Sequence, residues 1–415
     1  MNLVIITPHV PYPLDEGGKI SQFSFAERLQ HLLKLTYIIR AYNDEVYAYG
    51  VAFKTSLPDA KIHIIDCRGL VKGNVMKKLL TSVKRRVVNF FYKCFLSNKT
   101  DACFDDYDRD IDFLREISRY EVNEILKLVD EIKPDLIQVE HTGYLNLVHA
   151  LPVSIVKIFV HHEIQFARLE SFKDPKTYYE IYKRSLIKGV ELSFLEKYDA
   201  VLTFSEIDTE RLNNCLVDRR VCTSPFPILD TYFEEVSIQD FKISKIIFVG
   251  PESHRPNYDA VVWYVDNIAE KIYLNTGLKS HIVGKWSEGS MKRLSREFIV
   301  FDGFVEDIMA NNRKSLVVVP IRGGSGIRTK ILYSLAQCLP IVSTSIGCEG
   351  IGLIPDRDIV IKDDVQGFLE SILFLVHNIN DAHRIANNGY LFAKAHFSQD
   401  KLVNKRLNIY ESLIK

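Results

Sequence analysis

The chain has 415 residues, more than one hydrophobic core usually holds, which favours two domains of about 200 residues each. Hydrophobic residues make up 47% and charged residues 26% of the sequence, a composition that excludes a disordered chain and a collagen-like fibre. The 53 basic residues balance the 53 acidic ones, which argues against a general nucleic-acid binder and leaves room only for a local basic patch.

The seven cysteines are an odd number and show no C-x-x-C spacing. We therefore expect reduced thiols in a cytosolic protein, with neither a disulfide framework nor a zinc site. The N-terminus lacks the basic region of a signal peptide, and no stretch reaches the roughly 18 apolar residues of a membrane-spanning helix.

The first half of the chain alternates short apolar runs with helical patterns. The apolar runs predict strands at residues 3–6, 35–41, 62–65, 135–139, 153–160 and 200–204. Helical spacing of apolar residues predicts helices over 23–33, 120–132 and 181–198. Strands that alternate with helices indicate a parallel sheet covered on both faces.

The same alternation restarts after the polar stretch 230–242. Apolar runs predict strands at 245–250, 280–283, 298–301, 316–319, 340–343 and 358–361. Helices are predicted over 259–273, 327–337, 365–377 and from 381 onward.

We therefore predict an α/β protein with two doubly wound, Rossmann-like domains, at residues 1–229 and 230–395. Residues 396–415 are predicted to form a C-terminal helix that could pack back on the first domain. In open parallel sheets, ligands bind outside the carboxyl ends of the strands. Two such sheets facing each other would place the site in the cleft between the domains.

The segment 320–330, PIRGGSGIRTK, lies between a predicted buried strand and an amphipathic helix. Glycines let backbone N–H groups approach an anion, and the helix N-terminus adds partial positive charge. The segment also has three cationic side chains, and no acidic residue occurs between Asp307 and Glu349. This pattern predicts a diphosphate-binding turn, the alternative being a tight turn with solvated arginines. Its candidate residues are Arg322, Gly324, Ser325, Gly326, Arg328 and Lys330.

Several segments together resemble glycosyltransferase family 4, retaining sugar transferases of the GT-B fold. GGSGIRTKILYSLAQCLPIVSTSIGCEGI is similar to the donor-binding segment of that family, and TPHVPYPLDEGGKI to its first glycine-rich loop. KIIFVGPESHRPNYDAVVWYVDNI resembles the opening of the second domain, and FIVFDGFVEDI the loop that holds the nucleotide base. The resemblance covers almost the whole chain. It implies a nucleotide-sugar donor and retaining transfer without a metal or other cofactor.

His161 and His162 end a predicted strand, and the carboxyl end of that strand should bring at least one imidazole to the cleft. The alternative is a histidine that caps the next helix. The resemblance implies that a histidine here contacts the donor sugar or supports the acceptor. With Arg328 and Lys330, these two histidines are the catalytic candidates.

The resemblance also implies further contacts to the donor. Gly17 and Gly18 would lie beside the diphosphate and the acceptor, and Phe304 and Val305 beside the base. Gly250 and Arg255 belong to a loop where the family places a basic residue near the phosphates; the alternative for Arg255 is an ordinary surface arginine.

Family members usually carry two glutamates eight positions apart, the second of which holds the donor ribose. This chain has Ser325 and Tyr333 at those positions. Loss of a charged hydrogen-bond partner weakens binding by about 1.5–3 kcal/mol, so Tyr333 bears directly on donor affinity. Glu349 is a candidate replacement carboxylate, or else a surface turn residue.

Residues 67–100 contain nine basic residues and no acidic one, with apolar residues repeating every three or four positions. This pattern predicts an amphipathic helix over about 72–96 on an anionic membrane surface; a core-packed helix with a solvated basic edge is the alternative. The following acidic run, 101–112, would repel nucleic acid. We expect a cytoplasmic protein attached peripherally to the inner face of the cell membrane.

The leading hypothesis is a retaining glycosyltransferase that moves a sugar to a saccharide or lipid-linked acceptor in cell-surface polysaccharide or glycolipid synthesis. A non-catalytic nucleotide-sugar binder, acting as the scaffold of an active transferase, is the main alternative, and a sugar-nucleotide epimerase is a third. A dinucleotide oxidoreductase is disfavoured because no G-x-G-x-x-G follows the first strand.

Overall fold

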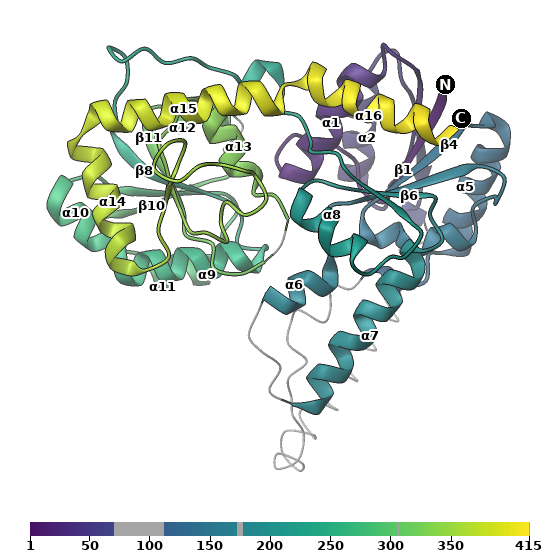
Figure 1. The fold of residues 1–415 in the computed structure, drawn as a ribbon, viewed down its shortest axis with the longest axis horizontal. Coiled ribbons are helices and arrows are strands. Elements are labelled where there is room, and N and C mark those ends of the chain that lie inside the picture. The colour runs from purple at the N-terminus through teal and green to yellow at the C-terminus, as the bar shows by residue number, and fades with distance from the viewer. Residues whose placement is uncertain (70–111, 172–176, 306, 325, 415) are drawn as a thin grey trace.

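The computed structural model describes residues 1–69, 112–171, 177–305, 307–324 and 326–414. It consists of two parallel sheets with flanking helices, side by side along the long axis of the molecule (Figure 1). The predicted basic helix over 72–96 and the candidate Ser325 lie outside the described residues.

The first sheet has seven parallel strands in the order β3-β2-β1-β4-β5-β6-β7. Its strands are β1 (Asn2–Thr7), β2 (Lys34–Ala41), β3 (Lys61–Asp66), β4 (Leu136–Glu140), β5 (Val156–His161), β6 (Ala200–Thr203) and β7 (Arg220–Thr223). The six predicted strands are confirmed. β7 was not predicted, because this partly exposed edge strand, RVCT, lacks the apolar run of a strand buried on both faces.

The helices of the first domain cover both faces of this sheet (Figure 1). They are α1 (Gly17–Leu29), α2 (Asp44–Ser56), α5 (Arg119–Ile132), α6 (Gln165–Ser171), α7 (Tyr178–Leu195) and α8 (Glu206–Asn213). Short turns of 3-10 helix are η2 (Asp112–Leu114), η3 (Thr142–His149) and η4 (Asp230–Tyr232). The N-terminus of α7 is set by a capping box, in which Thr177 and Glu180 each accept a backbone N–H from the other.

The second sheet has six parallel strands in the order β10-β9-β8-β11-β12-β13. They are β8 (Lys245–Val249), β9 (Ser280–Val283), β10 (Ile299–Gly303), β11 (Ser315–Val319), β12 (Ile341–Ser343) and β13 (Val360–Ile361). The helices are α9 (Arg255–Tyr264), α10 (Glu270–Thr276), α11 (Glu288–Leu294), α12 (Ile308–Asn312), α13 (Thr329–Ala336), α14 (Val365–His377), α15 (Ile379–Phe397) and α16 (Gln399–Ile414). The predicted helix 259–273 is α9 and α10 joined by a π-helical turn, η5 (Val265–Ala269).

Both sheets have a topological switch point, at which the strands stop being added on one side of the first strand and begin to be added on its other side. It lies between β1 and β4 in the first sheet and between β8 and β11 in the second. Ligands of doubly wound sheets bind at the carboxyl ends of the strands beside such a point. The loops after these four strands are therefore where a site is expected.

The chain crosses between the domains twice, and the two crossings lie together. The predicted boundary at residues 229 and 230 falls between β7 and β8. Beside it, the N–H of Ile228 donates to the carbonyl of Phe397, 2.8 Å away, at the end of α15. The chain then continues into α16, which packs against α1 of the first domain.

One apolar cluster connects the domains. It includes Phe25 of α1, Phe226 before the crossing, Ile246 of β8 and Tyr410 of α16. Beside it, Arg406 of α16 is 1% exposed, with its guanidinium 3.5 Å from the centre of the Phe25 ring. None of the helices in the described part of the chain combines the length and apolar character that crossing a membrane requires.

Candidate active site

The carboxyl ends of the two sheets meet where the domains touch. Gly17, the first residue of α1, packs so closely on the start of α13 that a Cβ atom there would lie 2.8 Å from the Cβ of Thr329. A Cβ at Gly326 would lie 3.2 Å from the backbone oxygen of His162. The first contact is with a side chain and the second with a backbone oxygen, and in both the missing side chain of glycine permits the close approach. These contacts bring the turn after β11 against the ends of β1 and β5.

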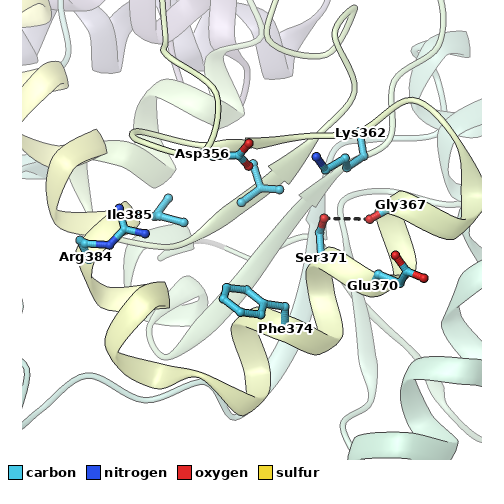
Figure 2. Close-up of a pocket in the computed structure, with 9 residues that line it drawn as sticks. Asp356, Lys362, Gly367, Glu370, Ser371, Phe374, Arg384 and Ile385 are labelled. Atoms are coloured by element: carbon cyan, nitrogen blue, oxygen red, sulfur yellow. Dashed lines mark hydrogen bonds between the residues drawn. The ribbon is translucent and has the colours of Figure 1, made fainter.

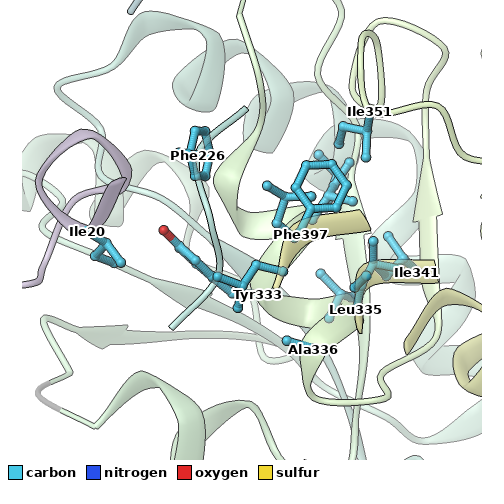
Figure 3. Close-up of a cluster of buried hydrophobic side chains, with 14 of the residues drawn as sticks. Ile20, Phe226, Tyr333, Leu335, Ala336, Ile341, Ile351 and Phe397 are labelled. Atoms are coloured by element: carbon cyan, nitrogen blue, oxygen red, sulfur yellow. The ribbon is translucent and has the colours of Figure 1, made fainter. Parts of the chain in front are cut away.

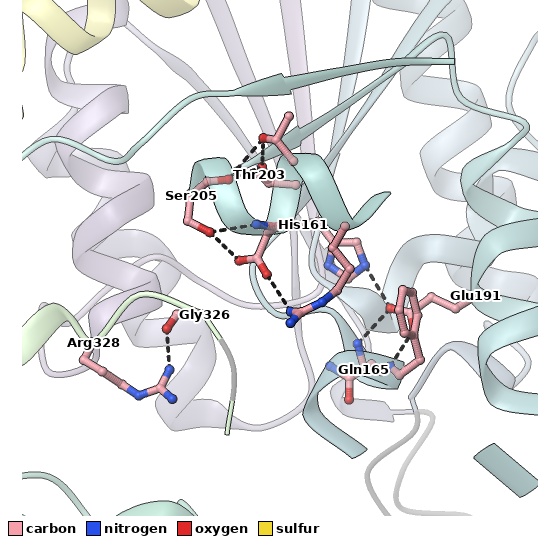
Figure 4. Close-up of polar contacts among 11 residues, drawn as sticks. His161, Gln165, Glu191, Thr203, Ser205, Gly326 and Arg328 are labelled. Carbon is pink, nitrogen blue, oxygen red and sulfur yellow. Dashed lines mark hydrogen bonds and ion pairs between the residues drawn. The ribbon is translucent and has the colours of Figure 1, made fainter. Parts of the chain in front are cut away.

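The predicted diphosphate-binding turn adopts a conformation that requires its glycines. The φ angles of Gly324 and Gly326 are 111° and 79°, both in the left-handed region. Arg328 then folds back, and its Nη1 donates a hydrogen bond to the carbonyl of Gly326 (Figure 4). With 7% exposure, Arg328 is a buried cation at the junction of the two domains.

Carboxylates of both domains face Arg328. Burial lowers the pKa of its guanidinium, whereas the negative charges of Glu163, Glu349 and Asp208 oppose this shift. Glu349, a candidate from the sequence, therefore lies within electrostatic reach of the turn. Asp208 is itself held by Ser205 and Arg211 (Figure 4).

Lys330, the second residue of α13, is the second cation. Its Nζ donates to Oδ1 of Asn257 at 2.7 Å and lies 4.2 Å from the centre of the Phe248 ring. Desolvation and the positive charge of Arg328 lower the pKa of Lys330 to about 7. Two cations thus lie close together, and the hydrogen-bond partner of the lysine is a neutral amide. An anion would stabilise such a pair.

The two candidate histidines point in different directions. Nε2 of His161 lies 2.9 Å from Oε1 of Glu191 in α7, and both side chains are fully buried (Figure 4). His162 instead lies beside α1, with its Nδ1 3.8 Å from the position of a Cβ on Gly18. Of the pair, His162 therefore lies next to the N-terminal glycine loop.

His162 belongs to a polar cluster at the ends of β4 and β5. Its ring stacks on His141, with centroids 3.9 Å apart and planes at 19°, and its Nε2 lies 2.6 Å from Oε2 of Glu140. Burial and neighbouring cationic groups lower the pKa of His162 to about 3. Burial also raises the pKa of Glu140, an effect opposed by His141, Arg406 and a hydrogen bond from Gln138.

Glu140, His141 and His162 offer three potential metal-ligand atoms within 4.8 Å of one another. However, the lone pair of an imidazole nitrogen lies in the ring plane, so an ion shared by two stacked rings would lie outside both planes. The stacked geometry therefore does not fit a shared metal ion.

The remaining donor-side candidates are spread over the loops of the second sheet. Arg255 forms an ion pair of 2.9 Å with Asp259 and lies over the Tyr258 ring, whereas Arg322 lies over the ring of Trp263. Phe304 is 48% exposed with Lys285 above its ring, and Val305 packs against the core.

A cavity of about 530 Å³ lies beyond the ends of β8 and β9, and Gly250 contacts one of its lining residues. The carbonyl of Gly250 accepts a hydrogen bond from Nε1 of Trp286. The cavity is lined by Glu252, Ser253, Lys285, Trp286 and Ser287. Another cavity, of about 340 Å³, lies between β13, α14 and α15 (Figure 2), and no residue predicted for the site lines it.

Tyr333 extends from α13 toward α1, with its hydroxyl directed to Ile20 (Figure 3). Its ring packs edge-on against Tyr232, with centroids 5.4 Å apart. The hydroxyl is buried and has no hydrogen-bond partner among the described residues. The position for which the resemblance implies a ribose-binding glutamate thus carries an unsatisfied hydrogen-bonding group.

Glu140, His141, Asn257 and Glu191 were missed by the sequence analysis. Glu140 ends β4 and His141 follows it, just as His161 ends β5 and His162 follows it, so the same signal was present there. Nothing local marks Asn257 or Glu191, since their roles arise from contacts with Lys330 and His161, distant in sequence.

Residues 243–378 match a family model described as "Glycosyl transferases group 1". This part of the second domain is similar to group 1 glycosyltransferases. The match covers the predicted diphosphate-binding turn and the loops that are predicted to contact the donor. A relative in Klebsiella pneumoniae, an uncharacterized 44.6 kDa protein in the cps region, is 24% identical over 174 residues, which are 39% of this chain and 45% of the relative. The chain thus matches less than half of that relative's length.

Solved structures share the complete two-domain fold. HepE of Anabaena in complex with UDP covers 99% of this chain and 100% of its own, with a TM-score of 0.65 and 12% identity. TarM of S. aureus, in complex with fondaparinux, alpha-GlcNAc-glycerol and UDP, covers 100% of both chains, with a TM-score of 0.67 and 11% identity. The predicted GT-B fold is confirmed, and the segment that matches the family model lies in its second half.

Proposed function

We propose that this protein is a retaining glycosyltransferase of family 4, which moves a sugar from a nucleoside diphosphate to a saccharide or lipid-linked acceptor. The observation that carries the proposal is the cation pair Arg328 and Lys330 on a glycine turn, opposite Gly17 and His162. The UDP complexes of HepE and TarM support a nucleotide-sugar donor. The genomic setting of the Klebsiella relative supports a role in cell-surface polysaccharide synthesis.

In this proposal, the turn and the two cations hold the diphosphate. The bond between the anomeric carbon and the phosphate oxygen breaks, and its electron pair moves to that oxygen, where Arg328 and Lys330 stabilise the charge. The acceptor oxygen bonds to the same face of the carbon, and its proton passes to the departing phosphate. His162 and Gly18 would border the acceptor. No step requires a metal or other cofactor.

The experiment screens UDP-, GDP- and ADP-sugars for release of the nucleoside diphosphate, with and without saccharide acceptors and with EDTA present. We expect one donor to react, and Lys330→Ala to lower its turnover by about 100-fold. Lys157→Met is the matched control, because Lys157 is a buried lysine near the start of β5, whose Nζ donates to two backbone carbonyls and lies 3.9 Å from Oδ2 of Asp199. Unchanged turnover of the Lys330 variant would refute the role of this residue, and an inverted product would refute retention.

Tyr333 favours a second candidate function, a non-catalytic nucleotide-sugar binder. Its ring fills space between α13 and α1, and no carboxylate stands at this position. Calorimetry with UDP and GDP, followed by the turnover assay, separates the two functions. Binding without turnover of any donor, with acceptors present, favours the scaffold.

We also propose peripheral attachment to an anionic membrane. Beyond the basic segment 72–96, support comes from α7, which extends away from the first domain (Figure 1). Its N-terminal half exposes large side chains, at Tyr178, Tyr179, Ile181, Tyr182 and Leu186. Tyrosines with nearby basic residues such as Lys183 are typical of membrane interfaces. In flotation assays we expect binding to vesicles with anionic lipid and loss of binding after Tyr178→Ser and Tyr182→Ser; absence of binding to any vesicle would refute the proposal.

A further inference from the structure

A chain of hydrogen bonds connects the C-terminal helix to His162. The hydroxyl of Tyr410 in α16 donates to Oε1 of Gln138 at 2.5 Å. Nε2 of Gln138 donates to Oε1 of Glu140 at 2.6 Å, and Oε2 of Glu140 lies 2.6 Å from Nε2 of His162. Tyr410, Gln138 and Glu140 are each 2% exposed or less. Each contact therefore lies in an environment where hydrogen bonds are strong and loss of a partner is costly.

These hydrogen bonds fix the orientation of each side chain in the series from Tyr410 to His162. A Gln amide has one acceptor oxygen and one donor nitrogen, so the hydroxyl of Tyr410 fixes which end faces Glu140. The amide N–H then occupies one carboxylate oxygen and leaves the other for His162. Burial raises the pKa of Glu140, and Arg406, on the same helix as Tyr410, opposes this shift with its positive charge.

We propose that Glu140, aligned by Gln138 and Tyr410, is a positioning residue for His162. It makes Nδ1 of His162, on the side of the ring that faces Gly18, a hydrogen-bond acceptor. An ionised carboxylate accepts only, so Nε2 of His162 carries the proton and donates it to Glu140. Nδ1, which faces Gly18, then has a free lone pair. Given the proposed glycosyltransferase function, this lone pair accepts a hydrogen bond from a hydroxyl of the acceptor that does not react, since the proton of the reacting hydroxyl passes to the departing phosphate. Helix α16 thereby contributes to the site from the far end of the sequence.

The tautomer of His162 can be measured without any substrate. In protein with ¹⁵N-labelled histidine, long-range proton–nitrogen correlation distinguishes the two ring nitrogens, and His162→Gln assigns the signal among the 12 histidines. At pH 7.5 we expect His162 to be protonated at Nε2. Tyr410→Phe and Glu140→Gln should shift it toward a mixture of tautomers.

Tyr198→Phe is the matched control, because Tyr198 is equally buried and its hydroxyl donates to a backbone carbonyl, that of Leu145. It should leave the His162 signal unchanged. A wild-type His162 protonated at Nδ1, or signals identical in wild type, Tyr410→Phe and Glu140→Gln, would overturn the proposal. Circular dichroism and melting temperature establish that each variant is folded.

Kinetics supply the second readout. Tyr410→Phe should lower kcat for transfer by about tenfold with unchanged affinity for UDP, and Tyr198→Phe should not. Should the wild type turn over no donor while the tautomer responds as expected, the proposed function fails and the positioning role stands. Should transfer occur with a tautomer that Tyr410→Phe does not affect, the positioning role fails and the proposed function stands.

Discussion

Lys330 carries its proton only marginally at neutral pH. With Asn257 as its hydrogen-bond partner and Arg328 as a cationic neighbour, the pKa of its ammonium group is lowered to about 7. A bound diphosphate would stabilise the charged form and raise this pKa. Donor binding and protonation of Lys330 are therefore linked.

We accordingly expect the affinity for UDP to fall by up to about tenfold per pH unit above pH 7.5, where the phosphates of UDP are already fully ionised. The affinity falls because Lys330 loses its proton in this pH range when UDP is absent, whereas it keeps the proton when UDP is bound. Calorimetry in buffers of different ionisation enthalpy should show proton uptake on binding. Lys330→Met should abolish the uptake, and Lys157→Met should preserve it.

The hydroxyl of Tyr333 is buried without a partner among the described residues, which makes its removal informative. Tyr333→Phe should raise the free energy of unfolding by about 1 kcal/mol, since an unsatisfied polar group is lost. If the hydroxyl serves the donor ribose, the same change lowers UDP affinity. Tyr264→Phe is the control, and it should lower the free energy of unfolding in urea titrations. The hydroxyl of Tyr264 is hydrogen-bonded to Ser280, and the substitution removes that bond. Destabilisation by both changes would contradict the prediction.

At the scale of elements, the start of α1 is where the domains come closest. Gly17 packs against Thr329, whereas the nearest atoms to a Cβ on the adjacent Gly18 lie 3.6 and 3.8 Å away, an ordinary contact. Position 17 therefore has no room for a side chain, whereas position 18, the next residue of the helix, does.

Gly17→Ala should therefore force α1 and α13 apart and lower the melting temperature by several degrees, about 1–3 kcal/mol in stability. Gly18→Ala should leave the melting temperature nearly unchanged, although it borders His162. Equal melting temperatures of the two variants would show that the contact between α1 and α13 is not tight in solution.

Elements buried on both faces were predictable, because runs such as those of β1 and β11 are apolar throughout. The turn at 320–330 was predictable too, since its glycines and cations are adjacent in sequence. In contrast, strand periodicity could not decide between His161 and His162. The contact of His161 with Glu191, 30 residues later, settles which ring turns inward. Tyr410 and Gln138 lie 272 residues apart, and no local pattern joins them.

At the scale of the whole molecule, α16 stabilises the first domain from the end of the chain. Arg406 lies over Phe25, and its Nε and Nη2 donate to the hydroxyl and carbonyl of Ser224. Its charge also favours the ionised form of Glu140. Removal of this buried cation leaves polar groups of the first domain uncompensated.

Arg406→Met should lower the free energy of unfolding by about 3 kcal/mol, measured by urea titration. Arg384→Met is the comparison, because Arg384 forms an exposed ion pair with Asp381 on the neighbouring α15. Its loss should change stability by less than about 0.5 kcal/mol. Similar small effects of both variants would mean that α16 contributes little to the first domain.

The paired crossings at Ile228 and Phe397 also determine how such proteins can be recombined. A chimera that takes its donor-side half from a relative needs two splice points, one within 233–244 and one at Ser398, between α15 and α16. A chimera with a single splice near residue 230 would also take α16 from the relative. That helix would then have to pack against Phe25 and Gln138 of this protein.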